Sequence, residues 1–299
     1  MIIETYDLTK KYGHKTACDQ INLSVEVGQV YGFLGRNGAG KSTCIKMLTG
    51  LVYPTSGSGT VLGKPLGDVS ARERLGYLPE LFRYQDWMTG LDLLKFHARL
   101  SKLKNRDAQM ARALKLVGLE GQEKYKVGSY SKGMQQRIGL ACALLAEPQL
   151  IFLDEPTSAL DPIGRKAVRD IIVALKDEGT TVFLNSHLLS EVEALCDSVT
   201  FIHQGRVVKS ARMDELLMNH ISLTIRAAGI TEELFSQMNN RYKSLQKLAE
   251  GRFTMALQDY EEIPALASFL LENEVTLYEL TPHRETLETV FMQIVGEEG

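Results

Sequence analysis

The residues with the clearest chemistry form the stretch Gly35-Arg36-Asn37-Gly38-Ala39-Gly40-Lys41-Ser42-Thr43, which fits the pattern G-x-x-x-x-G-K-S/T. Its glycines let the backbone approach a phosphate closely, because no Cβ stands in the way. Successive N–H groups at a helix start bind anions, and the helix dipole favours the same charge. Lys41 would reach the β- and γ-phosphates, and Ser42 would offer its hydroxyl to Mg²⁺. The pattern therefore predicts a nucleotide-binding loop, whose further contact residues are Asn37, Gly38, Ala39, Gly40 and Thr43.

A loop of this kind needs a strand before it and a helix after it. The apolar run from Gln29 to Leu34 predicts a buried strand, and Cys44 to Gly50 predicts a short helix. Further strands alternate with helices along the chain, and this order predicts an α/β core with a parallel sheet. The composition of Pro54 to Gly59 predicts a loop.

Two domains are expected. Residues 1–210 would form the α/β core, interrupted by a mainly helical subdomain at about 83–146. Residues 211–299 follow the order β-α-β-β-α-β, which predicts a small ferredoxin-like α+β domain.

The overall composition narrows the class of protein. The chain has 299 residues, 44% of them hydrophobic and 24% charged, as in an ordinary soluble globular protein. A net charge of −3 gives no indication of nucleic-acid binding. The four scattered cysteines form no C-x-x-C pair, so disulfides and zinc are not expected. No signal peptide is expected from the first residues, and the apolar run at 138–146 is well short of the ~18 residues that span a bilayer.

Two adjacent acids follow the apolar run that begins at Leu150. At the carboxyl edge of a parallel sheet, Asp154 would hold Mg²⁺ directly or through water. Glu155 would be the general base for an attacking water. Two acids before a proline are by themselves more typical of a solvated turn, but a nucleotide loop in the same chain favours the catalytic interpretation.

A second candidate phosphate contact lies at Tyr130-Ser131-Lys132-Gly133-Met134, where a helix is expected to begin. Ser131 and the N–H groups of this helix start would bind a γ-phosphate. An ordinary serine N-cap is the structural alternative, and it uses the same donors.

Together these segments resemble the nucleotide-binding subunit of an ATP-binding-cassette (ABC) transporter. Residues 35–43 match its Walker A motif, 150–154 its Walker B motif and 131–134 its signature loop. The sequence Ser158-Ala159-Leu160-Asp161 matches the D-loop, and His187 matches the switch histidine. The resemblance covers residues 1 to about 210 and implies ATP and Mg²⁺ as cofactors.

The resemblance also implies roles for individual residues. Two copies of the chain would meet head to tail, so that Ser131 and Gly133 of one copy, with Asp161 of its D-loop, complete the ATP site of the other. His187 would contact the γ-phosphate. Tyr12 would stack on adenine, although an aromatic residue in a turn often only packs.

Two departures from the family pattern stand out. The signature usually reads L-S-G-G-Q, whereas Tyr130, Lys132 and Met134 replace three of its residues here. Glu80 stands where the family usually has a glutamine that contacts Mg²⁺ and the attacking water, which adds negative charge near the ion. Both variants resemble the exporter branch, as does the tail from Leu287 to Phe291.

We therefore expect an ATPase subunit that energises a separate transmembrane permease, most simply for export. It would lie in the cytoplasm, peripherally on the inner membrane, with a periplasmic protein as a further candidate partner and no nucleic acid. The segment 81–89, which includes Trp87, would receive the permease; the alternative for Trp87 is a core anchor of the helical subdomain. Two rival functions are a soluble ABC ATPase acting on ribosomes or nucleic acid, and an ATP-gated regulatory module with low turnover.

Overall fold

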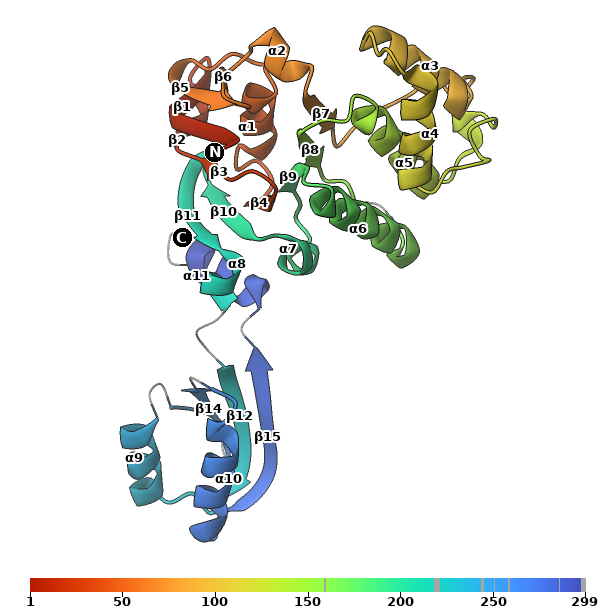
Figure 1. Cartoon of the computed structure of the whole chain (residues 1–299). Helices are drawn as coiled ribbons and strands as arrows, with labels where there is room; N and C mark the ends of the chain where they lie inside the picture. Colours follow the sequence, from red (N-terminus) through yellow and green to blue (C-terminus); the bar gives the residue numbers. More distant parts are fainter. Residues whose placement is uncertain are drawn as a thin grey trace. The chain divides into compact units, whose positions relative to one another are not determined.

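The computed structural model describes residues 1–158, 160–217, 221–242, 245–249, 251–257, 259–284 and 286–296. The chain divides into two compact units, Met1–Met213 and Asp214–Gly299 (Figure 1). Within the described residues, no helix combines the length and the apolar character needed to cross a bilayer. All four cysteines are free thiols.

The centre of the first unit is a six-stranded sheet with the order β11-β10-β4-β9-β8-β7. All neighbouring strands in it run parallel except β11, which is antiparallel to β10. The strand bounds are β4 Val30–Leu34, β7 Leu75–Leu78, β8 Leu150–Asp154, β9 Thr181–Asn185, β10 Ser198–His203 and β11 Arg206–Arg212. Every residue of β4, β8 and β9 is buried, which explains their continuous apolar sequences. The predicted parallel α/β core is thus confirmed.

Four aromatic rings join the three central strands of this sheet. The ring of Phe183 in β9 lies 5.6 Å from that of Tyr31, 5.4 Å from that of Phe33 and 5.1 Å from that of Phe152, measured between centroids. Tyr31 and Phe33 belong to β4, and Phe152 belongs to β8. Tilted aromatic pairs at these separations are favourable beyond the area they bury. This aromatic cluster therefore holds β4, β8 and β9 together.

An antiparallel sheet lies in the same unit and has the order β2-β1-β5-β6, with β3 paired to β1. Its strands are β1 Ile3–Tyr12, β2 Lys15–Ile21, β3 Ser24–Val25, β5 Ser56–Val61 and β6 Lys64–Pro65. The loop predicted from Pro54 to Gly59 is wrong, because β5 begins at Ser56 and pairs with β1. A Cβ on Gly57 would stand 2.3 Å from the carbonyl oxygen of Asp7. The small residues of this segment thus permit a close approach of two strands.

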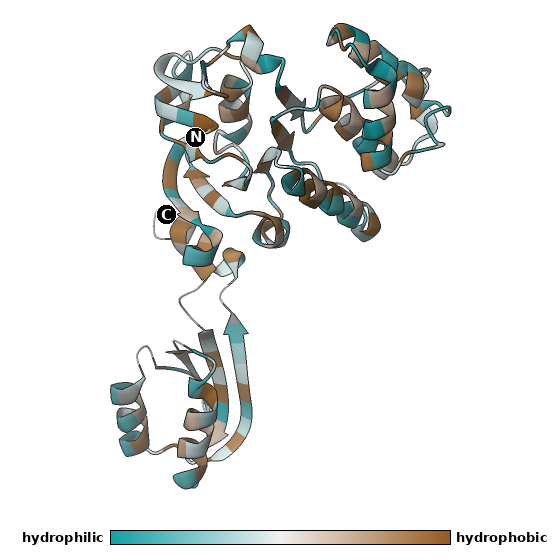
Figure 2. Ribbon diagram, in the orientation of Figure 1, coloured by the Kyte–Doolittle hydropathy of each residue, from teal (hydrophilic) through white to brown (hydrophobic). Residues whose placement is uncertain are grey.

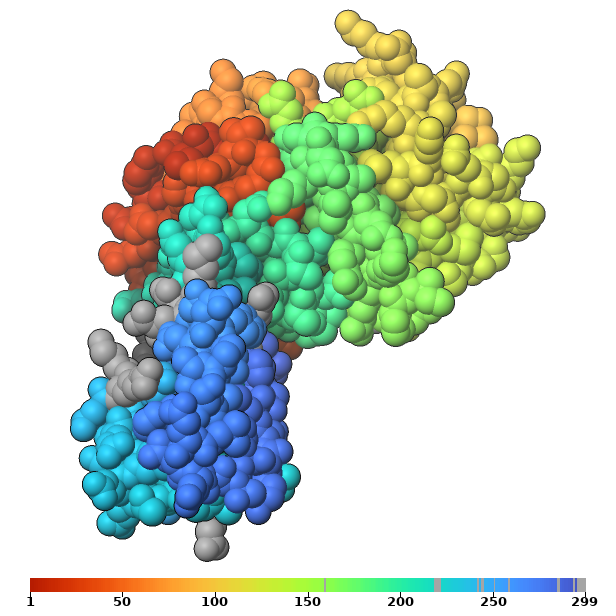
Figure 3. All heavy atoms as spheres, turned by 60° about the horizontal axis from the view of Figure 1, so that its bottom comes forward, coloured from red at the N-terminus to blue at the C-terminus, as the bar shows by residue number. Residues whose placement is uncertain are grey.

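The helical subdomain contains α3 Gly90–Leu100, α4 Arg106–Leu116 and α5 Lys132–Leu144. It forms a lobe of the first unit, coloured yellow to yellow-green in Figure 3. Thr89 caps α3, since its hydroxyl accepts a hydrogen bond from the N–H of Asp92 at 3.1 Å. The helical character expected from Arg83 begins only at Gly90, and residues 79–89 form an irregular loop after β7.

The remaining helices of the first unit flank the parallel sheet or connect its strands. They are α1 Lys41–Leu48, α2 Val69–Arg72, α6 Pro162–Asp177 and α7 Leu189–Leu195, with a 3₁₀ turn at Val127–Ser129. Figure 2 shows α6 with alternating hydrophilic and hydrophobic residues, as expected for a helix with one buried face. Its buried residues are Val168, Ile171, Ile172 and Leu175. The short helix α8, Met213–Leu217, lies where the two units divide.

The second unit is built around a four-stranded antiparallel sheet with the order β13-β14-β12-β15. Its elements are β12 Ile221–Ala228, α9 Glu232–Arg241, β13 Gln246–Ala249, β14 Arg252–Leu257, α10 Glu262–Glu272, β15 Thr276–Arg284 and α11 Leu287–Gly296. The order from β12 to β15 is β-α-β-β-α-β, which is the ferredoxin-like arrangement. Side chains from the sheet, such as Leu223 and Ile225, form its core with Met238, Leu266 and Leu270 of the helices.

Candidate functional site

The segment between β4 and α1 has the backbone of a phosphate-binding loop. Gly38 has a φ of 82° and Gly40 a φ of 106°, values in the left-handed region that favours glycine. A Cβ on Gly40 would stand 2.3 Å from the carbonyl oxygen of Ala17, and one on Gly35 would stand 2.3 Å from that of Ile202. Both glycines are therefore required by the neighbouring backbone. Within the loop, Asn37 and Gly38 are exposed, whereas Ala39 is buried.

Lys41 begins α1 and is only 7% exposed. Its Nζ donates hydrogen bonds to the carbonyl oxygens of Gly35 at 2.6 Å and Arg36 at 3.3 Å. Burial lowers the pKa of Lys41, while the carboxylates of Glu155, Asp154 and Glu80 oppose that effect. The ammonium group thus bonds to the backbone of its own loop. A bound phosphate would offer it stronger acceptors than these two carbonyls.

The next two residues of α1 remain partly accessible. Ser42 and Thr43 are half-buried, so their hydroxyl groups lie at the same helix start as the loop N–H groups. This is the position in which a serine or threonine can bind a cation beside a phosphate.

Asp154 is the last residue of β8 and is 3% exposed. Burial raises the pKa of its carboxyl, and the nearby charge of Glu80 raises it further. A hydrogen bond from Asn185, and then the charges of Lys41 and Lys46, act in the opposite direction. A buried carboxylate without a full set of donors is a suitable ligand for a divalent cation, which would replace the lost hydration.

The carboxylate of Glu155 lies in direct contact with the imidazole of His187. Glu155 Oε2 lies 2.6 Å from His187 Nδ1, and the Glu155 side chain is 8% exposed. The His187 side chain is 53% exposed, so its other ring nitrogen remains open to a ligand. The carboxylate fixes the ring orientation, as expected for a pair that handles protons or phosphate.

Glu80 follows β7 and is exposed. It acts on Lys41 and Asp154 through its charge, raising the pKa of each. Its place near these two residues is consistent with the family's metal-contacting position, and its negative charge is an addition to that site.

Tyr12 ends β1 at the turn that leads into β2. Its ring is 49% exposed, and Lys10 Nζ lies 5.1 Å from the ring centroid. The exposed part of the ring is available to stack on an aromatic base. The ring also makes a cation–π contact with Lys10, which is its packing contact in the chain.

The signature and D-loop residues lie at the starts of two helices. Ser131 caps α5 by accepting a hydrogen bond from the N–H of Met134 at 3.2 Å. Asp161 caps α6 by accepting one from Gly164 at 2.8 Å. A Cβ on Gly133 would meet no atom closer than Ser131 Oγ at 4.0 Å, so this helix start is open. The D-loop residue Ala159 lies outside the described residues.

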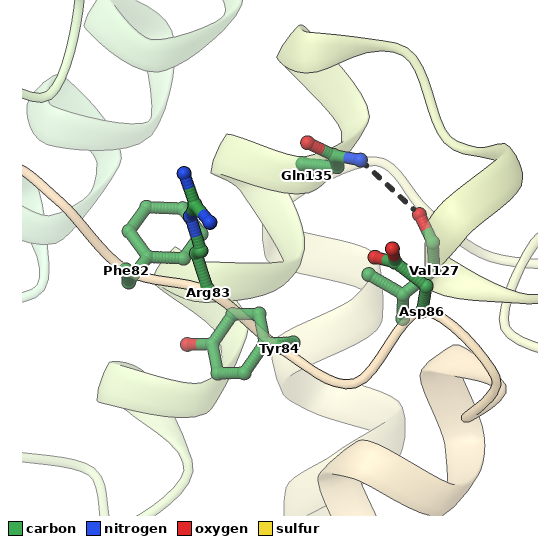
Figure 4. A pocket seen from close by; sticks show the side chains of 6 residues that line it. All are labelled: Phe82, Arg83, Tyr84, Asp86, Val127 and Gln135. Carbon is green, nitrogen blue, oxygen red and sulfur yellow. Dashed lines mark hydrogen bonds between the residues drawn. The ribbon is translucent and has the colours of Figure 1, made fainter.

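A pocket of about 280 Å³ opens where the loop after β7 meets α5 (Figure 4). Its lining side chains are Phe82, Arg83, Tyr84, Asp86, Val127 and Gln135. Gln135 Nε2 donates to the carbonyl oxygen of Val127 at 3.3 Å. Trp87 is 70% exposed, so the alternative that it is a core anchor is wrong.

The sequence interpretation missed Asn185 as part of the site. Asn185 Nδ2 donates to Asp154 Oδ1 at 2.5 Å, and both residues end neighbouring parallel strands. The available signal was a polar residue directly after the apolar run at 181–184, because strand ends of a parallel sheet meet at one edge.

Comparisons with known proteins agree with this geometry. The family model described as ABC transporter matches residues 18–158. The bacitracin transport ATP-binding protein BcrA of Bacillus licheniformis is 35% identical over 312 residues, covering 99% of this chain and 97% of that protein. Among solved structures, the ATP-binding subunit of an ABC transporter superposes with a TM-score of 0.66 at 31% identity, covering 72% of this chain and 92% of that one.

A further solved structure shares the fold at 23% identity. It is the dimeric ATP-binding cassette MJ0796 in a post-hydrolysis state bound to ADP and Pi, with a TM-score of 0.64 over 71% of this chain and 98% of that one. Since BcrA is matched along nearly its whole length, the chain belongs to the ATP-binding proteins of the ABC transporter family.

Proposed function

We propose that this chain hydrolyses ATP at the loop between β4 and α1 and thereby drives a separate membrane permease that exports its cargo. The observation that carries this proposal is the convergence of Lys41, Asp154 and the Glu155–His187 pair on one edge of the parallel sheet. The full-length similarity to BcrA, a bacitracin transport ATP-binding protein, supports the transport role.

The chain's own residues divide the work of hydrolysis. Lys41 would exchange its carbonyl acceptors for phosphate oxygens, and Ser42 with Asp154 would hold Mg²⁺. These two residues would supply only part of the coordination shell, and Mg²⁺ in such sites takes further ligands from the phosphates of the nucleotide and from water. Bound there, Mg²⁺ would neutralise charge on the β- and γ-phosphates.

Glu155 would accept the proton of the attacking water. His187, oriented by the same carboxylate, would contact the γ-phosphate through its exposed ring edge. The remaining donors would come from a second copy of the chain, through the open helix starts at Ser131 and Gly133 and the D-loop residue Asp161. Tyr12 would pack against adenine.

The permease would bind at the loop 81–89 and the pocket of Figure 4. The chain would accordingly lie on the cytoplasmic face of the inner membrane. A periplasmic partner would contact the permease and not this chain.

The test is ATP turnover by the purified chain with and without its permease in proteoliposomes. We expect Mg²⁺-dependent phosphate release that the permease and its cargo stimulate. Turnover that ribosomes or nucleic acid stimulate, with no effect of the permease, would instead support the soluble alternative. Tight ATP binding with no measurable turnover would identify an ATP-gated regulatory module.

A further inference from the structure

Asn185 contacts the acidic pair of the site through its side chain. It is the last residue of β9 and lies directly opposite Asp154, the last residue of β8, in the parallel register. Asn185 Nδ2 donates to Asp154 Oδ1 at 2.5 Å, and the two residues are 1% and 3% exposed. Only the amide NH₂ can donate to an ionised carboxylate, so this contact determines which way the amide is turned.

The backbone of Asn185 contacts the second acid. The N–H of Glu155 donates to the carbonyl oxygen of Asn185 at 2.9 Å. Glu155 itself has a φ of 54°, in the left-handed region that a side chain occupies only when its surroundings hold it there. Because this turn follows Asp154 immediately, the hydrogen bond to Asn185 helps to direct the two neighbouring carboxylates to different partners.

The histidine of the same segment completes the arrangement. Two residues after Asn185, His187 binds Glu155 Oε2 at 2.6 Å. The segment 185–187 therefore contacts both acids, with Asn185 on Asp154 and His187 on Glu155.

Stability alone gives a poor account of an asparagine here. Its Oδ1 atom is buried and has no hydrogen-bond partner among the described residues. An unpaired buried oxygen costs about 1–3 kcal/mol, and the asparagine bears this cost while its Nδ2 bonds to the buried carboxylate of Asp154. The residue is better explained by what its Nδ2 does to Asp154.

We propose that Asn185 is a positioning residue for ATP hydrolysis, which fixes one oxygen of Asp154 and leaves the other available to the magnesium ion. This inference rests on the proposed function. Removing a side chain that orients a metal ligand typically lowers metal affinity or activity by about 10–100-fold. We expect a loss in that range when Asn185 is replaced, with little effect on the contacts between the loop 35–43 and the nucleotide.

The experiment compares Asn185→Leu with the wild-type chain. Mn²⁺ binding in the presence of a non-hydrolysable ATP analogue is followed by electron paramagnetic resonance, and binding of a fluorescent ATP analogue is measured in EDTA. We expect Mn²⁺ binding to weaken by about 10–100-fold, while metal-free nucleotide affinity changes by less than about 3-fold. If the leucine variant does not fold, Asn185→Ala, which has no side-chain donor, is judged by the same criteria.

Thr200→Val is the matched control, because Thr200 is a fully buried polar residue that bonds to Tyr31 at 2.5 Å and Ser210 at 2.6 Å. It should lose stability and keep its Mn²⁺ affinity. Mn²⁺ binding that stays within about 3-fold of wild type in the Asn185 variant, or that falls equally in the control, would overturn the inference. A wild-type chain that neither binds the Mn²⁺ complex nor hydrolyses ATP would overturn the proposed function instead.

Discussion

Replacing Glu155 by glutamine tests the chemical step most directly. Glutamine has the same shape and keeps an oxygen near His187 Nδ1, which now lies 2.6 Å from the carboxylate. It cannot accept a proton from water at neutral pH. Loss of a general base lowers kcat by about 10²–10⁴-fold. That range corresponds to about 2.7–5.4 kcal/mol in the activation free energy.

ATP binding should survive this substitution. The loop glycines and Lys41 are unchanged, and the neutral amide removes a charge that is only 8% exposed. We therefore expect phosphate release to nearly disappear, while ATP affinity stays within about 3-fold of wild type. Because ATP stays bound and uncleaved, a dimer of the chain should also accumulate. It would appear as an ATP-dependent shift in size-exclusion chromatography.

Glu178→Gln serves as the control for this experiment. Glu178 has its own close side-chain partner, Arg112 Nη2 at 2.6 Å, but both side chains are nearly half exposed, and Glu178 lies at the C-terminal end of α6. Its loss should leave kcat unchanged. If Glu155→Gln and Glu178→Gln turned over ATP at the same rate, Glu155 could not be the base.

Three further predictions concern the rest of the first unit. Lys41→Ala should abolish ATP binding in isothermal titration calorimetry, because among the described residues Lys41 is the only lysine whose ammonium group bonds to the loop carbonyls. Retained affinity would contradict the phosphate-binding assignment. Asp154→Asn should raise the melting temperature of the nucleotide-free chain at pH 7 and abolish Mg²⁺-dependent turnover. Burial raises the pKa of Asp154 above the value of about 3.9 in the unfolded chain, so the wild-type fold loses stability as the pH rises from about 3.9 towards the raised value. Below about pH 3.9 the carboxyl is protonated in both states, and the difference in melting temperature between wild type and Asp154→Asn should vanish. A lower melting temperature for Asp154→Asn at pH 7 would show that the fold stabilises the carboxylate instead. Trp87→Ala should change the free energy of unfolding by no more than about 0.5 kcal/mol because the side chain is 70% exposed, yet it should weaken copurification with the permease; an unaffected complex would remove Trp87 from the interface.

The sequence predicts most of the central sheet because its strands are buried on both faces. Continuous apolar runs as short as 150–153 favour strands buried on both faces, and their alternation with helices leads to the parallel arrangement. The sequence predicts a loop at Ser56, where the structure has the strand β5, because most residues of this strand are not apolar. Its serines and glycines lack the usual strand residues, and only the approach of β1 gives them a strand conformation.

Some parts of the candidate site can be predicted from the sequence and others cannot. The residues of the loop 35–43 lie close together in sequence, so their pattern carries their geometry. Asn185 and Asp154 are far apart in the sequence and meet only through the register of β8 and β9, which no local pattern specifies. The roles assigned to Ser131, Gly133 and Asp161 depend on a second copy of the chain, and they stay predictions.

The aromatic cluster beneath the site has a consequence for the behaviour of the protein on heating. Phe183 touches rings on both neighbouring strands, and the ends of those three strands carry the loop 35–43, Asp154 and the segment 185–187. None of the three can loosen without disturbing a packed ring, so the catalytic edge should melt together with the sheet and not before it. The positions of these strand ends should then persist up to the unfolding transition of the sheet and be lost with it.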